Sequence, residues 1–163
     1  MAITLARIDD RVIHGQTITR WAGALKCDGI LVISDKVAAD ELRKKVLRAA
    51  AQGLKLGIYN VQQGIGALQK AHESKKSFFI ISDSPREFAN LKRAGGDFGL
   101  VLNIGNMSGT RPGMKNVGHA VCLTPEDVED FDYLASQGIE LSFQLIPDDS
   151  PRKWADVKSK YQA

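Results

Sequence analysis

The segment RIDDRVIHGQ, residues 7–16, gathers side chains that suit phosphoryl transfer. His14 offers an imidazole nitrogen as a nucleophile, and Asp9 or Asp10 can hold the other ring nitrogen so that the reactive one stays unprotonated. Arg11 lies three residues before His14 and carries paired N–H groups that match phosphate oxygens. The segment therefore predicts a histidine that accepts a phosphoryl group beside its own anion-binding groups.

A helix is expected to begin directly after this histidine, near Gly15 or Gln16. The unpaired N–H groups and the positive dipole end of a helix favour a bound anion, and a glycine lets the backbone approach it closely. The expected catalytic residue is therefore His14. The expected phosphate-binding residues are Arg11, Gly15 and Gln16, and the expected orienting residues are Asp9 and Asp10.

Residue types alone leave other interpretations of this loop open. A lone histidine in a polar loop is usually solvated surface, and a regulatory or small-molecule binding module would use the loop to hold an anion without covalent capture. A metal site is not expected, because the spacing of His14 and the aspartates is irregular and the neighbouring arginines would repel a cation. His72 and His119 lack such charged company and are expected to be structural or solvent-facing.

Composition limits the classes of function. A chain of 163 residues suits a single domain over residues 1–163, and a net charge of +3 permits a phosphorylated ligand but is too small for nucleic-acid binding. Cys27 and Cys122 are far apart beside apolar segments, as in a reduced cytoplasmic protein. No secretory signal or membrane span is expected. No Walker loop appears in the sequence, and no nucleotide, metal or cofactor is expected.

Strands and helices alternate along the chain. The apolar runs at 30–34, 78–82 and 99–105 do not alternate with polar residues, which is typical of strands covered on both faces of a parallel sheet. Residues 4–8 and 54–59 are weaker strand candidates. Polar residues follow these strands where ligands bind in such sheets, but Asp35, Asp83 and Asn103 are each explained by the polar turn that ends a strand.

Three helix starts carry Ser or Thr followed by Pro, at residues 84–85, 124–125 and 150–151. Glu87 and Asp127 stand where a capping box needs an acidic side chain.

The late segment IELSFQLI, residues 139–146, alternates apolar and polar residues, so we expect a strand with one wet face. We place it at the edge of the sheet, where an antiparallel direction is allowed. Residues 105–118 are expected to form a long loop. The predicted fold is α/β, a single-domain open, mostly parallel, doubly wound sheet with helices on both faces and a late edge strand that is free to run antiparallel.

The segment LARIDDRVIHGQ, followed by Arg20 and Trp21, resembles the opening signature of the mannose/fructose/sorbose-family IIB component of the bacterial phosphoenolpyruvate-dependent sugar phosphotransferase system. The resemblance continues through SDKVAADELRKKVLRAAA at 34–51, LNIGNM at 102–107 and the segment 123–149, and so covers nearly the whole chain.

The resemblance implies a phosphotransferase subunit that carries the phosphoryl group on His14, at Nδ1. A IIA component, itself charged by the phosphocarrier HPr, would be the donor. The acceptor would be a sugar entering through the IIC and IID membrane subunits, so the protein would be cytoplasmic and peripherally associated with the inner face of the membrane. Arg7, Arg20 and Arg111 are expected to steer an acidic IIA surface. Arg111 and Lys115 depart from the family's usual Gly-Lys arrangement in their loop.

Overall fold

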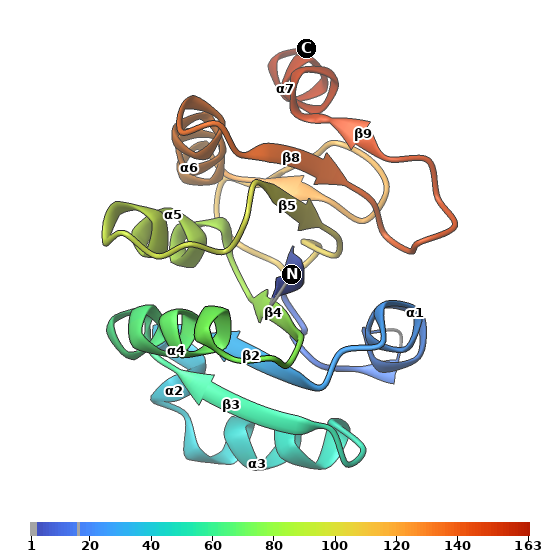
Figure 1. Ribbon diagram of the computed structural model, residues 1–163. Helices are drawn as coiled ribbons and strands as arrows, with labels where there is room; N and C mark the ends of the chain where they lie inside the picture. Colours follow the sequence, from blue (N-terminus) through green and yellow to red (C-terminus); the bar gives the residue numbers. More distant parts are fainter. Residues whose placement is uncertain (1–2, 16) are drawn as a thin grey trace.

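The computed structural model describes residues 3–15 and 17–163, with the backbone alone at 17–19. Among the described residues, seven strands form one sheet in the order β3-β2-β4-β1-β5-β8-β9, and β9 alone runs antiparallel to its neighbour (Figure 1). This confirms the predicted fold class. The strands are β1 (Ile3–Ile8), β2 (Gly29–Ile33), β3 (Lys55–Tyr59), β4 (Phe78–Ser82), β5 (Val101–Ile104), β8 (Glu140–Phe143) and β9 (Arg152–Lys153).

Helices cover both faces of the sheet, which explains why its central strands are apolar without alternation. Figure 1 shows α4, α5 and α6 along one face and α1 on the other. The helices are η1 (Thr17–Ala22), a π-helical segment that continues into α1 (Gly23–Leu25), then α2 (Asp35–Ala38), α3 (Glu41–Ala50), α4 (Val61–Glu73), α5 (Pro85–Arg93), α6 (Pro125–Ser136) and α7 (Trp154–Gln162).

The sheet divides the core into two apolar clusters. Leu68 of α4, Phe88 of α5 and Phe131 of α6 belong to one cluster. Trp21 of η1 and Leu47 of α3 belong to the other. Each face of the sheet is thus buried by side chains from its own set of helices, and the polar strand ends are left at the rim.

The late strand differs from the prediction in its place. β8 lies inside the sheet, parallel to β5, and the antiparallel edge is the short strand β9. Leu141 and Phe143 are buried while Glu140 is exposed, so the alternation reports a strand covered on one face rather than an edge strand. Because β9 takes up residues 152–153, α7 begins at Trp154 and not at the Ser-Pro pair expected to open it.

Two local predictions also change. The expected loop 105–118 contains β6 (Lys115–Asn116), which pairs antiparallel with β7 (Cys122–Leu123). The capping box at the start of α6 is confirmed, because Thr124 and Asp127 bond reciprocally. The box expected at Ser84 is wrong: Ser84 is the N-cap of α5 but its side chain makes no cap hydrogen bond.

These caps predict a contrast in stability. Thr124→Ala removes the hydroxyl that accepts the Asp127 N–H at 3.2 Å, and we expect it to lower the free energy of unfolding by about 1 kcal/mol. Ser84→Ala removes no cap bond and should change it by less than about 0.5 kcal/mol. Urea unfolding of both variants measures the difference. Equal losses would contradict the assignment of the caps.

Candidate functional site

The predicted site residues follow β1, the strand at the point where the order of strands reverses. The chain adds β2, β3 and β4 on one side of β1 and then β5, β8 and β9 on the other, and ligands of open α/β sheets bind at such a point. Two backbone hydrogen bonds fix the first turn of the loop: Asp9 N–H donates to Ser82 O and Asp10 N–H to Asn106 O, each at 2.9 Å. The loop is therefore anchored on both neighbouring strand ends.

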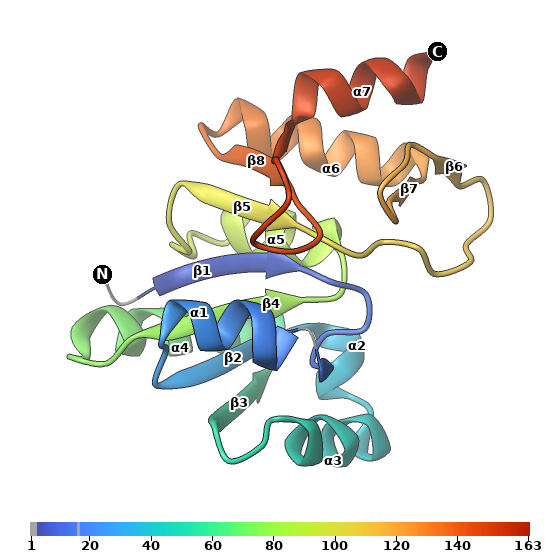
Figure 2. The ribbon, with the colours of Figure 1, turned by 90° about the vertical axis from the view of Figure 1, so that its right-hand side faces the viewer.

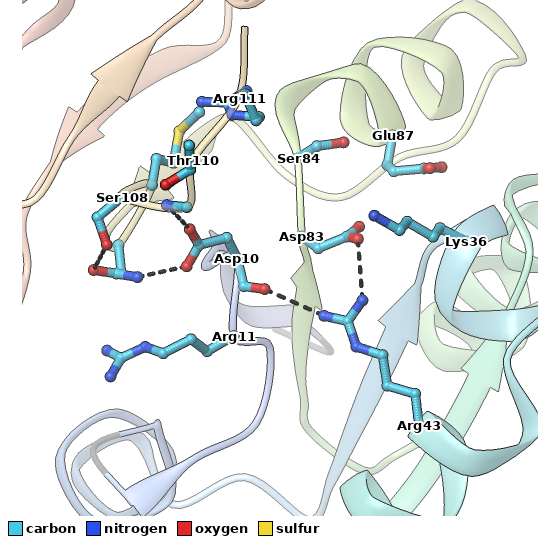
Figure 3. A pocket seen from close by; sticks show the side chains of 13 residues that line it. Asp10, Arg11, Lys36, Arg43, Asp83, Ser84, Glu87, Ser108, Thr110 and Arg111 are labelled. Atoms are coloured by element: carbon cyan, nitrogen blue, oxygen red, sulfur yellow. Dashed lines mark hydrogen bonds and ion pairs between the residues drawn. The ribbon is translucent and has the colours of Figure 1, made fainter. Parts of the chain in front are cut away.

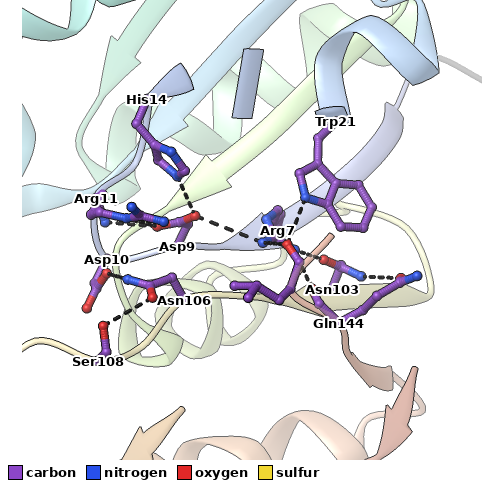
Figure 4. Close-up of polar contacts among 11 residues, drawn as sticks. Arg7, Asp9, Asp10, Arg11, His14, Trp21, Asn103, Asn106, Ser108 and Gln144 are labelled. Atoms are coloured by element: carbon purple, nitrogen blue, oxygen red, sulfur yellow. Dashed lines mark hydrogen bonds and ion pairs between the residues drawn. The ribbon is translucent and has the colours of Figure 1, made fainter. Parts of the chain in front are cut away.

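His14 is held by Asp9 (Figure 4). Its Nε2 lies 2.8 Å from Asp9 Oδ2, and Asp9 is buried while 18% of the His14 side chain is exposed. A buried carboxylate accepts a hydrogen bond from a ring N–H, so Nε2 carries the proton in this pair. Nδ1 is then the nitrogen with a free lone pair. The geometry also decides between the two aspartates, since Asp10 does not contact the ring among the described interactions.

Asp10 instead holds the loop that follows β5. Its carboxylate accepts hydrogen bonds from Asn106 Nδ2 and, at 2.7 Å, from the Gly109 N–H. Asn106, in turn, accepts a bond from the Ser108 hydroxyl at 3.1 Å. Consecutive aspartates thus serve different segments, Asp9 the histidine and Asp10 the loop 106–109.

Arg7 is a buried cation behind Asp9. Its side chain is 1% exposed, its Nη2 lies 3.9 Å from Asp9 Oδ2, and its guanidinium lies 4.4 Å from the centre of the Trp21 ring. Burial lowers the pKa of Arg7 to about 10, so it stays charged at neutral pH. Arg7 therefore cannot steer a partner protein from the surface, which corrects the expectation for this residue. It balances the charge of Asp9 from within the core.

Arg7 also joins three segments far apart in the sequence. It donates to Asn103 Oδ1 on β5 and, at 2.8 Å each, to the carbonyl oxygens of Gln144 and Leu145. Figure 2 shows the loop between β8 and β9 turning back toward β1, where these carbonyls lie. A Cβ on Gly105 would sit 1.7 Å from Arg7 Nη2, so the guanidinium fits only against a residue without a side chain. Asn103 is thus a buried partner of Arg7 rather than a turn residue.

The expected phosphate-binding residues are placed unequally. The side chain of Arg11 is 51% exposed, its Nε lies 3.8 Å from Asp9 Oδ1 and its backbone N–H donates to the same oxygen at 3.0 Å. Gly15 is exposed and helical, and a Cβ there would meet nothing within 4 Å. Gln16 lies outside the described residues. Arg11 and Gly15 therefore flank His14 on an open side of the molecule.

Two basic residues of the loop after β5 face elsewhere. Arg111 donates to Asp127 Oδ2 at 2.7 Å and to Cys122 O at 2.8 Å. Lys115 Nζ donates to the carbonyl oxygen of Tyr161 at 2.7 Å, near the end of α7. Their hydrogen bonds are therefore structural, although Arg111 also lies on the wall of a pocket described below.

Comparison with known proteins identifies the family. The model of the sorbose subfamily IIB component of the phosphotransferase system matches residues 3–163. The chain belongs to this IIB family. It is 34% identical over 150 residues to the sorbose-specific EIIB component of Klebsiella pneumoniae, which covers 91% of this chain and 90% of that protein. It is 35% identical to the mannose-specific EIIAB component of Escherichia coli, covering 98% of this chain and 49% of that protein.

The fold agrees with solved structures of IIB proteins. The crystal structure of the IIBSor domain of the sorbose permease from Klebsiella pneumoniae superposes with a TM-score of 0.89 at 32% sequence identity, covering 98% of each chain. The protein is thus the IIB component of a sugar-specific phosphotransferase system, and a role in phosphoryl transfer during sugar transport follows from that.

A pocket with a volume of about 530 Å³ lies next to the loop of this IIB component (Figure 3). Asp10 and Arg11 line one side, and Glu87 at the start of α5 lines the other. Burial raises the pKa of Glu87 to about 7, aided by the nearby carboxylates of Asp35 and Asp83 and opposed by a backbone hydrogen bond from Asp35. The sequence predicts Glu87 only as part of a helix cap, and no pattern in the sequence indicates that it lines a pocket.

Neither a metal-binding group of side chains nor a membrane-spanning helix is found in the described part of the chain. Within residues 3–15 and 17–163, no three His, Cys, Asp or Glu side chains gather in a group able to hold a metal ion. In the same part of the chain, every helix is too short or too polar to cross a membrane.

The buried Arg7 predicts a large cost on its removal. Arg7→Met leaves Asp9 without its buried counter-charge and removes the donor that Arg7 supplies to the carbonyl oxygens of Gln144 and Leu145, so we expect a loss of about 3–5 kcal/mol in the free energy of unfolding. The matched control is Arg20→Met, which removes an exposed arginine 3.2 Å from Asp148 and should cost less than about 1 kcal/mol. Chemical denaturation compares the two, and similar costs would contradict the buried role.

Glu87 predicts a pH dependence of stability. Its pKa is raised from 4.5 to about 7 in the folded protein, so the unfolded chain loses this proton first and stability falls as the pH rises from about 4.5 through about 7. Glu87→Gln removes that loss, and its melting temperature relative to the wild type should rise over this range. Glu73→Gln, on the exposed end of α4, should keep a constant offset. A constant offset for both variants in a thermal melting series would contradict the raised pKa.

Proposed function

We propose that His14 accepts a phosphoryl group on Nδ1 from a IIA component and passes it to a sugar entering through IIC and IID membrane subunits. The observation that carries the proposal is the 2.8 Å contact between His14 Nε2 and the buried Asp9. It orients a partly exposed ring so that Nδ1 is the nucleophilic nitrogen.

In the first transfer, the Nδ1 lone pair forms a bond to phosphorus while the bond between phosphorus and the donor nitrogen breaks. The His14 ring gains positive charge as the new bond forms, and Asp9 stabilises that charge because its carboxylate accepts the hydrogen bond from the Nε2–H group of the ring. In the second transfer, the N–P bond breaks, the sugar hydroxyl oxygen takes the phosphoryl group and the ring returns to neutrality. The hydroxyl proton leaves to solvent or to a nearby base.

The charges around His14 suit the transition state of both steps. Phosphoryl transfer passes through a loose transition state that spreads negative charge over three oxygens, so positive groups at the site lower the barrier. Arg11 supplies an exposed guanidinium next to Asp9. Arg7 places a positive charge 3.9 Å from Asp9 Oδ2 and so holds that carboxyl group in place from the buried side. We assign phosphate binding to Arg11 and Gly15, and orientation to Asp9.

A IIA donor is supported by the mannose-specific EIIAB relative from Escherichia coli, of which this chain matches 49%. Its name joins IIA and IIB in one protein, so a separate IIA component is the natural donor for a IIB chain like this one. With IIC and IID as the acceptor side, the protein would work at the inner face of the membrane, held there through the transporter.

His14→Ala should abolish phosphorylation. We expect the wild type, incubated with enzyme I, HPr, phosphoenolpyruvate and the cognate IIA, to gain the mass of one phosphoryl group, and the variant to gain none. His72→Ala is the matched control, because His72 also makes a 2.8 Å ring hydrogen bond but lies on α4, on a different element from the loop. It should be labelled like the wild type in intact-mass spectrometry.

Two results would contradict the proposal. Acid-labile label that persists in His14→Ala would move the acceptor to another residue. An unchanged mass of the wild type, together with saturable binding of inorganic phosphate, would instead indicate an anion-binding module without covalent capture.

A further inference from the structure

Two neighbouring strands in the middle of the sheet, β1 and β5, stand apart at the ends where they begin. Among the described residues, β1 pairs with β4 from its first residue to its last, whereas its ladder with β5 consists of the two pairs Arg7–Asn103 and Ile8–Ile104. Figure 2 shows the start of β5 lying away from the start of β1. Over residues 3–6, the edge of β1 that faces β5 therefore has no strand beside it.

The main chain of β5 also directs a hydrogen-bond donor into this gap. Leu100 O accepts the N–H of Glu140 on β8 at 2.8 Å, and the C=O and N–H of a trans peptide group point in opposite directions. The N–H of Val101 belongs to the same peptide group as Leu100 O, so it points toward β1, where the ladder does not reach. Main-chain groups need a partner, and a strand edge without one is a template for another strand.

The gap is a pocket of about 570 Å³ with mostly apolar walls. It is lined by residues 3–6 of β1, by residues 97–101 and by His72 of α4. Leu100 is 72% exposed and Val101 43%, although β5 is an interior strand. An extended segment of about four residues spans roughly 13 Å, the same length as residues 3–6 of β1. The gap thus has the length and the apolar walls that a short added strand requires.

The charge at the rim of the pocket favours a cationic group on the ligand. Of the described residues that line the pocket, Asp97 carries the one carboxylate, and none is a lysine or an arginine. The Asp97 side chain is 73% exposed, its Oδ1 accepts the Gly99 N–H at 3.0 Å and its Oδ2 lies 3.8 Å from His72 Nε2. His72 Nε2 also donates to the main-chain oxygen of Asp97 at 2.8 Å, which holds this loop against α4. A lysine side chain or a free amino end of a ligand would therefore find its counter-charge at Asp97.

We propose that the gap between β1 and β5 binds an extended peptide segment of a partner protein. The main chain of the segment would pair with the free edge of β1 and with the Val101 N–H. Its apolar side chains would cover Leu100, and a basic residue or an amino end would lie beside Asp97. In this mode of binding, main-chain hydrogen bonds supply the affinity and alternate side chains supply the specificity.

The position of the gap separates this binding from the reacting histidine. The gap lies at the amino end of β1, whereas His14 follows the carboxyl end of the same strand. A bound segment would therefore tether the protein to a partner and leave the loop of His14 open to a donor and an acceptor. Binding needs no phosphorylation, so this proposal does not depend on the proposed function.

The test is an NMR titration of the full ¹⁵N-labelled chain with a short synthetic peptide that begins with lysine and continues with alternating valine and threonine, which favour strands. We expect saturable shifts of the amides of Leu5, Ala6 and Val101, with a dissociation constant on the order of 0.1–1 mM. The matched control is the same peptide with methylated backbone nitrogens, which keeps the side chains and the charge but lacks the N–H donors. It should bind about tenfold more weakly or not at all.

Substitutions at exposed positions locate the binding without disturbing the core. Leu100→Ser removes an apolar contact, and Asp97→Asn removes the negative charge while it keeps an oxygen for the Gly99 N–H. Each should weaken binding of the unmethylated peptide about three- to fivefold. Leu42→Ser is the control for the first variant, because Leu42 is 74% exposed on α3 and lies outside the pocket, and it should leave the affinity unchanged.

Three results would overturn the proposal. The first is the absence of saturable shifts at the three amides. The second is equal binding of the methylated peptide, which would indicate a pocket for apolar small molecules and no strand pairing. The third is an affinity that neither Leu100→Ser nor Asp97→Asn weakens, or that Leu42→Ser weakens to the same extent. Labelling of His14 by the charged IIA donor is measured separately on the same sample, so either proposal can fail while the other stands.

Discussion

The site of this IIB component depends on one buried pair of opposite charges, Arg7 and Asp9. Each is 1% exposed, and burial of an ionised group is tolerated only where partners replace the lost water. Asp9 is surrounded by Arg7, the Arg11 backbone N–H and the His14 ring, while Arg7 is bound by carbonyl and amide oxygens. A carboxylate fixed in this way has little freedom to rotate. The orientation of the His14 ring follows from that rigidity.

The same pair explains how distant parts of the chain meet at one point. The oxygens that bind Arg7 come from β5 and from the loop after β8, and Leu145 O also accepts the Trp21 Nε1–H at 3.2 Å. The helical segment after His14 is thereby tied to the C-terminal part of the sheet. On the other side, Asp10 ties the loop after β5 to the same turn. The turn after β1 is thus supported from both halves of the sheet before any ligand arrives.

Much of the sheet could be predicted from the sequence, because strands covered on both faces show unbroken apolar runs, as at 30–34 and 78–82. The position of β8 within the sheet could not be predicted, because the alternation of apolar and polar residues indicates one solvent-exposed face but not which strands lie beside it. The two residues of β9 are too few to show a pattern. The charge cluster marks the position of the site. Which aspartate touches His14 depends on contacts with Ser82 and Asn106, which lie far away in the sequence. The burial of Arg7 and the free oxygen of Glu87 likewise arise only once the chain has folded.

The lack of space at Gly105 links two positions in evolution. With arginine at position 7, the guanidinium occupies the volume that any side chain at position 105 would need. Replacement of Arg7 by a shorter residue would remove the counter-ion of Asp9, although it would make room at position 105. A side chain at position 105 would in turn clash with Arg7, so neither substitution is harmless alone. Acceptable changes at these two positions would have to arise together, and this restricts the routes by which the site can be remodelled.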